Sequence, residues 1–231
     1  MATKRILNVV TNVDSYQETD AETGLWLSEL THAYDIFEAA GYEQTLVSPN
    51  GGKSPLEPRS LKFPSFDSSA KKWFNNPERM QLLETTAAPA EINAKDYDAI
   101  FFTGGHAVMY DFPGSEGLQQ LTREIYENGG IVAAVCHGYC GLLETTLSNG
   151  EHLVKGKNLT GFSWNEEVLA GVAKKVPYNV QERMENLGAN YSKGLIPFSS
   201  YTVVDGRLVT GQNPGSAKET AEKTVEVLQG L

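Results

Sequence analysis

One adjacent cysteine and histidine stand out among the residues of this sequence that could carry out covalent chemistry. Cys136 and His137 directly follow the continuous apolar run Ile131–Val135, and Gly138 comes next. Such a run is typical of a strand buried on both faces of a parallel sheet. A sharp turn from that strand into a helix strains the corner residue and presents its side chain, while a small residue lets the backbone pass. The pattern predicts that Cys136 is a nucleophile mounted on a strand-to-helix turn.

The same position predicts how reactive Cys136 should be. The N–H groups and the dipole at the start of a helix favour an anion, so we expect a lowered pKa for the Cys136 thiol. His137 can supply the base or the acid that a cysteine nucleophile needs. The alternative is a buried structural cysteine, as most free cysteines are. Cys140, four residues on, is either a resolving thiol for oxidised Cys136 or another small buried residue.

The other three histidines, His32, His106 and His152, lack the paired spacing of a zinc site, and we expect no metal. His106 follows Gly104 and Gly105 and is a candidate for the lining of a pocket. This glycine pair lacks the spacing of a glycine-rich nucleotide loop.

The composition excludes several classes of protein. With 40% hydrophobic and 21% charged residues, the 231-residue chain can bury a sizeable core, and we expect a single domain over residues 1–231. A net charge of −10 disfavours a nucleic-acid partner. No run of about 18 apolar residues predicts a membrane span, and no signal peptide precedes the first apolar run. Two cysteines so close in sequence indicate a reducing compartment, so we expect a cytoplasmic protein.

Apolar strands alternate with amphipathic helices along the chain. Strands are expected at residues 5–10, 42–49, 97–103 and 131–135, helices at 23–41 and 117–130, an inserted helix at 67–85, a hairpin at 201–204 and 207–210, and a last helix at 217–228. This alternation predicts a flavodoxin-like α/β sandwich, a mostly parallel sheet with helices on both faces. Ligands of such sheets bind beyond the carboxyl ends of the strands. We therefore expect the loops at 104–106, 136–138 and 161–163 to converge on one crevice.

Several segments resemble a known family. AVCHG at residues 134–138, GGH at 104–106 and GLWLSELTHAY at 24–34 are similar to motifs of the DJ-1/PfpI superfamily, and most of all to its glyoxalase III and heat-shock-chaperone branch. This superfamily is related in fold to class I glutamine amidotransferases. The similarity runs nearly from end to end, through residues 124–138, 153–171 and 205–221.

The resemblance implies roles for individual residues. It places the nucleophile at Cys136, its histidine at His137 and the triad acid at Glu167, with the neighbouring Glu166 as a rival for that role. It also implies that the Glu29 carboxyl contacts the thiol, where a low-dielectric pocket could keep it protonated or poised as a base.

The resemblance further implies an oxyanion site. Backbone N–H groups of Gly104, Gly105, His106 and His137 would form it. This chain departs from the branch at Tyr139 and Cys140, where proline and a small residue are usual. The Tyr139 phenol either faces a substrate oxygen in the pocket or is a packed aromatic ring.

The function implied by the resemblance is glutathione-independent conversion of methylglyoxal to lactate, a lyase reaction of the D-lactate dehydratase type. It needs no cofactor, its substrate is a small 2-oxoaldehyde, and protein deglycation would use the same thiol. The alternatives are a stress-related holdase chaperone that binds unfolded clients, a cysteine hydrolase or peptidase, and an amidotransferase-like protein. Members of the superfamily are often dimers, which implies a homodimer here.

Overall fold

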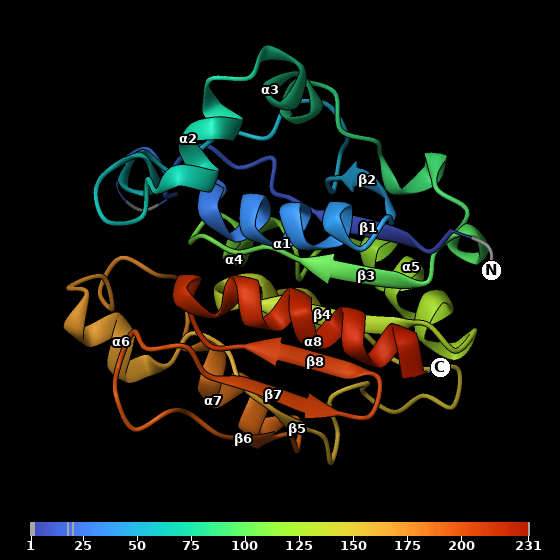
Figure 1. The fold of residues 1–231 in the computed structure, drawn as a ribbon. Coiled ribbons are helices and arrows are strands. Elements are labelled where there is room, and N and C mark those ends of the chain that lie inside the picture. Colours follow the sequence, from blue (N-terminus) through green and yellow to red (C-terminus); the bar gives the residue numbers. More distant parts are fainter. Residues whose placement is uncertain (1–2, 18, 20, 231) are drawn as a thin grey trace.

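The computed structural model describes residues 3–17, 19 and 21–230. Within them, apolar segments form a six-stranded sheet in the order β2-β1-β3-β4-β8-β7 (Figure 1). The first five strands in this order are parallel to their neighbours, and β7 runs antiparallel to β8 at the edge. The strands are β1 (Arg5–Val9), β2 (Glu43–Val47), β3 (Ala99–Phe102), β4 (Ile131–Val135), β7 (Thr202–Asp205) and β8 (Leu208–Gly211).

Helices cover both faces of this sheet, as Figure 1 shows. On one face, α1 (Leu27–Ala39) and α8 (Ala217–Gly230) pack on a cluster that includes Phe37 and Phe101. On the other face, α4 (Val108–Asp111) and α5 (Glu116–Glu127) pack on a cluster that includes Phe102 and Ile125. All of β4 is buried, and its side chains alternate between the two clusters. The flavodoxin-like α/β sandwich predicted from the sequence is confirmed.

Residues 158–191 build a second, smaller unit beside the edge of the sheet. Its strands β5 (Asn158–Leu159) and β6 (Asn190–Tyr191) pair with each other, and α6 (Trp164–Leu169) and α7 (Val180–Asn186) belong to the same region. The strand that precedes the loop at 161–163, β5, thus lies outside the main sheet. It is still joined to β8, because the Thr160 N–H donates to the Thr210 hydroxyl at 2.9 Å.

The single helix expected at residues 67–85 is wrong, because the chain forms two helices there. Asp67 caps α2 (Ser68–Phe74) by accepting from the Ala70 N–H, and Asn76 caps α3 (Pro77–Glu84) in the same way. Pro77 cannot continue α2, since it has no N–H to donate. Trp73 of α2 is buried against the outer side of α1.

The remaining helical turns are short 3₁₀ segments: η1 (Pro58–Leu61), η2 (Pro89–Glu91), η3 (Ala94–Asp96), η4 (Cys136–Leu142) and η5 (Pro214–Ser216). The chain after Cys136 is therefore a 3₁₀ turn and not the α-helix that the elbow pattern predicts. The hairpin turn lies one residue later than expected, since Asp205 pairs with Leu208. None of the helices in the described ranges has the length and apolar character needed to cross a membrane.

Candidate active site

Cys136 occupies the sharp turn that the sequence predicts. It directly follows β4 and has a φ of 56°, a left-handed conformation that is strained for a residue with a side chain. Gly138 makes the turn possible, because a Cβ atom there would lie 2.3 Å from the Phe102 carbonyl oxygen. The side chain is only 3% exposed. Cys136 thus sits in an enclosed elbow and not on an open corner.

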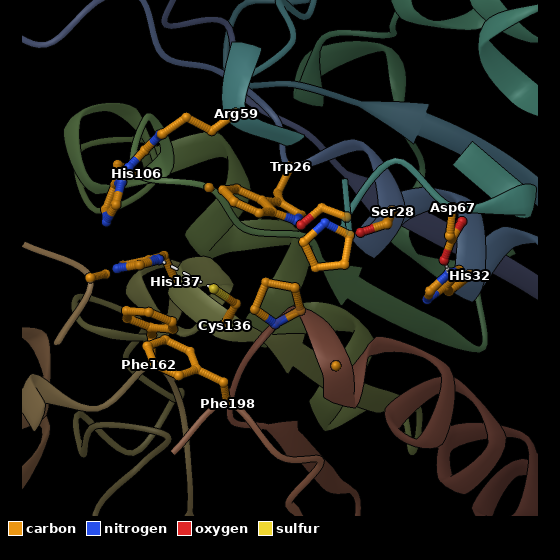
Figure 2. Close-up of a pocket in the computed structure, with 16 residues that line it drawn as sticks. Trp26, Ser28, His32, Arg59, Asp67, His106, Cys136, His137, Phe162 and Phe198 are labelled. Carbon is orange, nitrogen blue, oxygen red and sulfur yellow. Dashed lines mark hydrogen bonds and ion pairs between the residues drawn. The ribbon is translucent and has the colours of Figure 1, made fainter. Parts of the chain in front are cut away.

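The thiol borders a cavity of about 430 Å³ beyond the carboxyl ends of the strands (Figure 2). All three loops expected to converge contribute to its wall, through Gly105 and His106, Cys136 and His137, and Phe162. This convergence is confirmed. The remaining lining residues are Trp26, Ser28, His32, Arg59, Pro64, Ser65, Asp67, Ala170, Phe198, Pro214 and Gly215.

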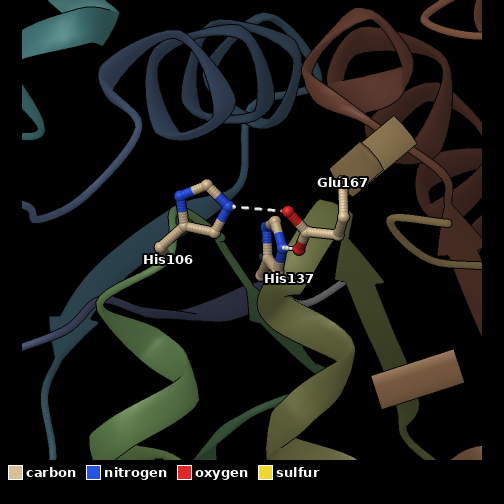
Figure 3. A group of neighbouring side chains, drawn as sticks. All are labelled: His106, His137 and Glu167. Atoms are coloured by element: carbon tan, nitrogen blue, oxygen red, sulfur yellow. Dashed lines mark hydrogen bonds and ion pairs between the residues drawn. The ribbon is translucent and has the colours of Figure 1, made fainter. Parts of the chain in front are cut away.

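His137 links the thiol to a carboxylate. Its Nδ1 atom lies 3.3 Å from Sγ of Cys136 (Figure 2). Its Nε2 atom lies 2.5 Å from Oε1 of Glu167 (Figure 3). Glu166 points elsewhere: it accepts from the Ser163 hydroxyl at the start of α6 and from the Asn213 side chain. Of the two adjacent glutamates, the one that contacts the histidine is Glu167.

Each carboxylate oxygen of Glu167 contacts a different histidine. Oε2 lies 3.1 Å from Nε2 of His106, and Figure 3 shows the two imidazole rings on the same carboxylate. Burial alone would raise the pKa of Glu167, but His137 and His106 hold it well below its usual range. Glu167 is therefore a carboxylate at neutral pH.

Glu29 approaches Cys136 from the first turn of α1. It is fully buried, its Oε2 atom accepts from the Gly104 N–H at 2.7 Å, and its carboxyl group interacts with the Cys136 thiol. Its Oε1 atom accepts no hydrogen bond from the rest of the described chain. Burial raises the pKa of Glu29 to about 8, and the contacts with Cys136 and Gly104 offset only part of that rise. Glu29 is therefore mostly protonated at pH 7.

The lowered pKa expected for Cys136 is wrong in this structure. Burial raises the pKa of the thiol well above its ordinary value, and the Glu29 carboxyl raises it further. The His137 N–H acts in the opposite direction but is a weaker influence. A short 3₁₀ turn in an apolar site does not compensate the cost of burying a thiolate, so the resting group is a thiol.

Gly104 and Gly105 hold the loop at 104–106 close to the start of α1. The Gly104 N–H is engaged by Glu29, and its carbonyl accepts from the Trp26 N–H at 3.0 Å. Gly105 has a φ of 112°, and a Cβ atom there would lie 2.2 Å from the Gly24 carbonyl oxygen. Gly104 thus holds Glu29, and its N–H does not point into the cavity as an unengaged donor.

Tyr139 and Cys140 do not line the cavity. The Tyr139 hydroxyl donates to the Phe162 carbonyl at 2.8 Å, and thereby supports the loop at 161–163. The expectation that Tyr139 faces the pocket is therefore wrong, because the ring does not line the cavity. Cys140 is fully buried and packs with Tyr178 on the α5 side of the sheet, whereas Cys136 belongs to the cluster on the other side. The two sulfur atoms are therefore not arranged as a nucleophile and a resolving thiol.

Three polar residues that hold the His106 ring were not predicted from the sequence. Nδ1 of His106 lies 2.7 Å from the Tyr16 hydroxyl and 2.8 Å from Nη2 of Arg59. Arg59 is itself anchored on the buried Glu57 carboxylate. None of these residues belongs to a motif. Tyr16 lies 43 positions from Arg59 and 90 from His106 in the chain, so no local signal connects them.

His106, His137 and Glu167 are grouped closely enough to suggest a metal site. The donor set does not fit one, because Arg59 can only donate and faces Nδ1 of His106. The proton of this neutral ring is then on Nε2, the atom that would have to bind the metal.

The sequence profile described as the DJ-1/PfpI family matches residues 21–227. The chain belongs to this family. The glutathione-independent glyoxalase HSP31 of Saccharomyces cerevisiae is 35% identical to it, over 99% of this chain and 100% of that protein. Glyoxalase 3 of Candida albicans is 32% identical over 97% of this chain and 99% of that protein.

Two solved structures have the same fold over nearly the whole chain. Rapid Encystment Protein 24 kDa of Francisella tularensis superposes with a TM-score of 0.93 at 33% identity, covering 98% of this chain and 99% of that one. The crystal structure of glyoxalase III from Candida albicans gives a TM-score of 0.89 at 31% identity, covering 97% of each. The resemblance read from the motifs is confirmed.

Proposed function

We propose that this protein is a glutathione-independent glyoxalase that converts methylglyoxal to lactate. The observation that carries the proposal is the placement of Cys136 between two carboxyl groups of opposite ionisation, a protonated Glu29 and an ionised Glu167 that acts through His137. The similarity to curated glutathione-independent glyoxalases supports the same assignment. The proposed reaction is of the lyase type and uses cysteine as the nucleophile.

The first step would form a covalent adduct. The Cys136 thiol transfers its proton to Nδ1 of His137, 3.3 Å away, and the sulfur adds to the aldehyde carbon. The ionised Glu167 carboxylate, which contacts Nε2 of His137, stabilises the imidazolium that forms. The aldehyde oxygen becomes an alkoxide, and we propose that the backbone N–H groups of Gly105, His106 and His137 donate to it. Return of the proton from His137 completes a hemithioacetal.

The second step would move one proton between neighbouring carbons. The ionised form of Glu29, the minor form at neutral pH, takes the proton from C1 of the hemithioacetal and returns it to C2, while the hydroxyl proton on C1 passes to the oxygen on C2. This leaves the acyl thioester of lactate on Cys136. A pKa of about 8 keeps the two forms of Glu29 close in free energy near neutral pH, as an acid–base shuttle requires. Attack of water on the thioester, with His137 as the base, releases lactate and regenerates the thiol. Every group in this scheme comes from the chain, the substrate or water, so we propose no cofactor.

The test is lactate production from a series of 2-oxoaldehydes without glutathione. We expect turnover by the wild-type protein and by Cys140→Ser, whose site is outside the cavity, and none by Cys136→Ser. A wild-type protein inactive on every 2-oxoaldehyde, or an active Cys136→Ser variant, would contradict the proposal. The cavity of about 430 Å³ exceeds the needs of a three-carbon aldehyde, so the series extends to larger substituents.

A second candidate function is a holdase chaperone, favoured by exposed apolar side chains near α6. Val168 and Leu169 lie on α6, Leu195 and Ile196 lie on the segment that Glu166 holds through the Phe198 N–H, and all are well exposed. Protection of an unfolding client protein by Cys136→Ala, undiminished from the wild type, would support this function.

We also keep the homodimer and the cytoplasmic location as proposals, tested by analytical ultracentrifugation and cell fractionation.

A further inference from the structure

The carboxylate that serves His137 is itself held by a second histidine. Glu167 places Oε1 on His137 and Oε2 on Nε2 of His106, and all three side chains are buried. The rings of the two histidines lie 4.4 Å apart between centroids. For Oε2 to gain a hydrogen bond, His106 must donate from Nε2, which depends on where the single proton of its neutral ring resides.

The groups on the other side of the ring decide that location. Nη2 of Arg59 lies 2.8 Å from Nδ1 of His106 and can only donate. The two hydrogens of Nη2 are shared among Nδ1, the Tyr16 hydroxyl at 2.7 Å and Oε2 of Glu57 at 2.9 Å, and the Tyr16 hydroxyl, 2.7 Å from Nδ1, can donate to that atom in place of Nη2. Nδ1 is therefore an acceptor. Burial, together with the neighbouring His137, lowers the pKa of His106 to about 4, so the ring stays neutral at working pH.

Arg59 is fixed in turn by a buried anion. Its Nε and Nη2 atoms donate to the two oxygens of Glu57, at 2.8 and 2.9 Å, and the Thr23 hydroxyl donates to Glu57 at 2.9 Å. Such a two-point contact holds the guanidinium plane in one orientation. The charged and titratable groups around His106 are thus Arg59 backed by Glu57 and Tyr16 on one side, and Glu167 and His137 on the other.

We infer that Arg59 and Tyr16 are positioning residues that hold His106 in its Nε2–H form. In that form His106 donates to Oε2 of Glu167, which leaves Oε1 aimed at His137. The opposite tautomer would direct a lone pair at the carboxylate and turn it away. This inference rests on the proposed function for its effect on turnover, but the tautomer itself does not.

The direct test is ¹⁵N NMR of the histidine rings, with the His106 signals assigned from their loss in His106→Gln. We expect the Nε2–H form in the wild type and in Arg59→Lys, which still donates, and a shift toward the Nδ1–H form in Arg59→Met. Arg79→Met is the matched control, since Arg79 pairs with Glu38 on the outer side of α1. An unchanged tautomer in a folded Arg59→Met protein would overturn the inference. The readout does not need turnover, so an inactive wild-type protein contradicts the proposed function alone.

A second pair of variants covers the case in which Arg59→Met fails to fold around an unpaired Glu57. His106→Gln keeps an N–H for Glu167, whereas His106→Phe keeps a ring without one. We expect kcat on methylglyoxal to fall about 10- to 100-fold in His106→Phe, as for other orienting partners of reactive groups, with little change in KM and with rescue in His106→Gln. Equal kcat values for the two variants, or an effect confined to KM, would contradict a positioning role.

Discussion

Two glutamates of the same site show how strongly surroundings control a carboxyl group. Glu29 interacts with the Cys136 thiol and the Gly104 N–H, and its pKa rises to about 8 because these contacts offset only part of the effect of burial. Glu167 is also buried, but two histidines hold its pKa well below the usual range. Environments that push the pKa values of two carboxyl groups apart are how enzymes assign acid and base roles. Here the protonated carboxyl is beside the sulfur, and the ionised one is beside the imidazole.

Glu29→Gln is the sharpest way to break this contrast, because the amide keeps the shape of the protonated carboxyl but cannot exchange a proton. We expect turnover of methylglyoxal to fall roughly 100- to 10,000-fold, the usual contribution of general acid–base catalysis. The measurement is kcat of the purified variant, with circular dichroism to show that it folds. Wild-type turnover would mean that Glu29 shuttles no proton.

The variant Glu167→Gln tests the role of the ionised carboxylate, and the same change at the adjacent Glu166 is its control. Loss of the negative charge leaves the imidazolium that forms at His137 during the reaction without its counter-ion, and we expect kcat to fall by up to about 10,000-fold, as when the carboxylate of a catalytic triad is replaced by its amide. Glu166→Gln is the control, since Glu166 binds Ser163 and Asn213 but no histidine. We expect it to lower the thermal stability more than kcat. If the two variants had the same kcat, the distinction between the glutamates would fail.

The stability of the fold should depend on pH with opposite sign at the two carboxyls. The pKa of Glu29 is raised from 4.5 to about 8 on folding, so its contribution is fully present below pH 4.5 and is lost as the pH rises to 8. This loss amounts to as much as about 5 kcal/mol. The pKa of Glu167 is lowered, so its contribution is present above pH 4.5 and is lost on acidification. Urea unfolding from pH 5 to 9 should show a decline that Glu29→Gln flattens; an identical decline in that variant would contradict the pKa assignment.

The smallest expected effect concerns the two thiols. We expect iodoacetamide to modify Cys136 before Cys140, because only Cys136 borders the cavity. The rate should rise with pH, since the resting Cys136 is a thiol. Peptide mapping by mass spectrometry measures both. Glu29→Gln should move this pH profile to lower pH, as the variant has no carboxylate to oppose the thiolate; labelling of Cys140 first would contradict the placement of the two thiols.

The sequence by itself determined the elbow and the sheet around it. A five-residue apolar run can be buried on both faces only in the middle of a covered parallel sheet, and a small residue two positions after Cys136 is needed for the backbone to pass Phe102. The alternation of strands and helices restricts the chain to a few parallel-sheet topologies, and in all of them the carboxyl ends of the strands lie at one edge of the sheet. The convergence of the loops at Gly105, Cys136 and Phe162 followed from this local information.

Only the tertiary structure decided which groups carry charge and which glutamate faces the histidine. Neighbouring residues of a helix point about 100° apart, so the rotation of α6 about its own axis selects Glu167 over Glu166. The ionisation of Cys136 and Glu29 depends on how completely α1 and the Gly104 loop exclude water, which no motif records. The tautomer of His106 likewise depends on Arg59, 47 positions away in the chain. Burial and hydrogen bonding between distant segments are properties of the packed chain, and they set the chemistry of a site that the sequence could only locate.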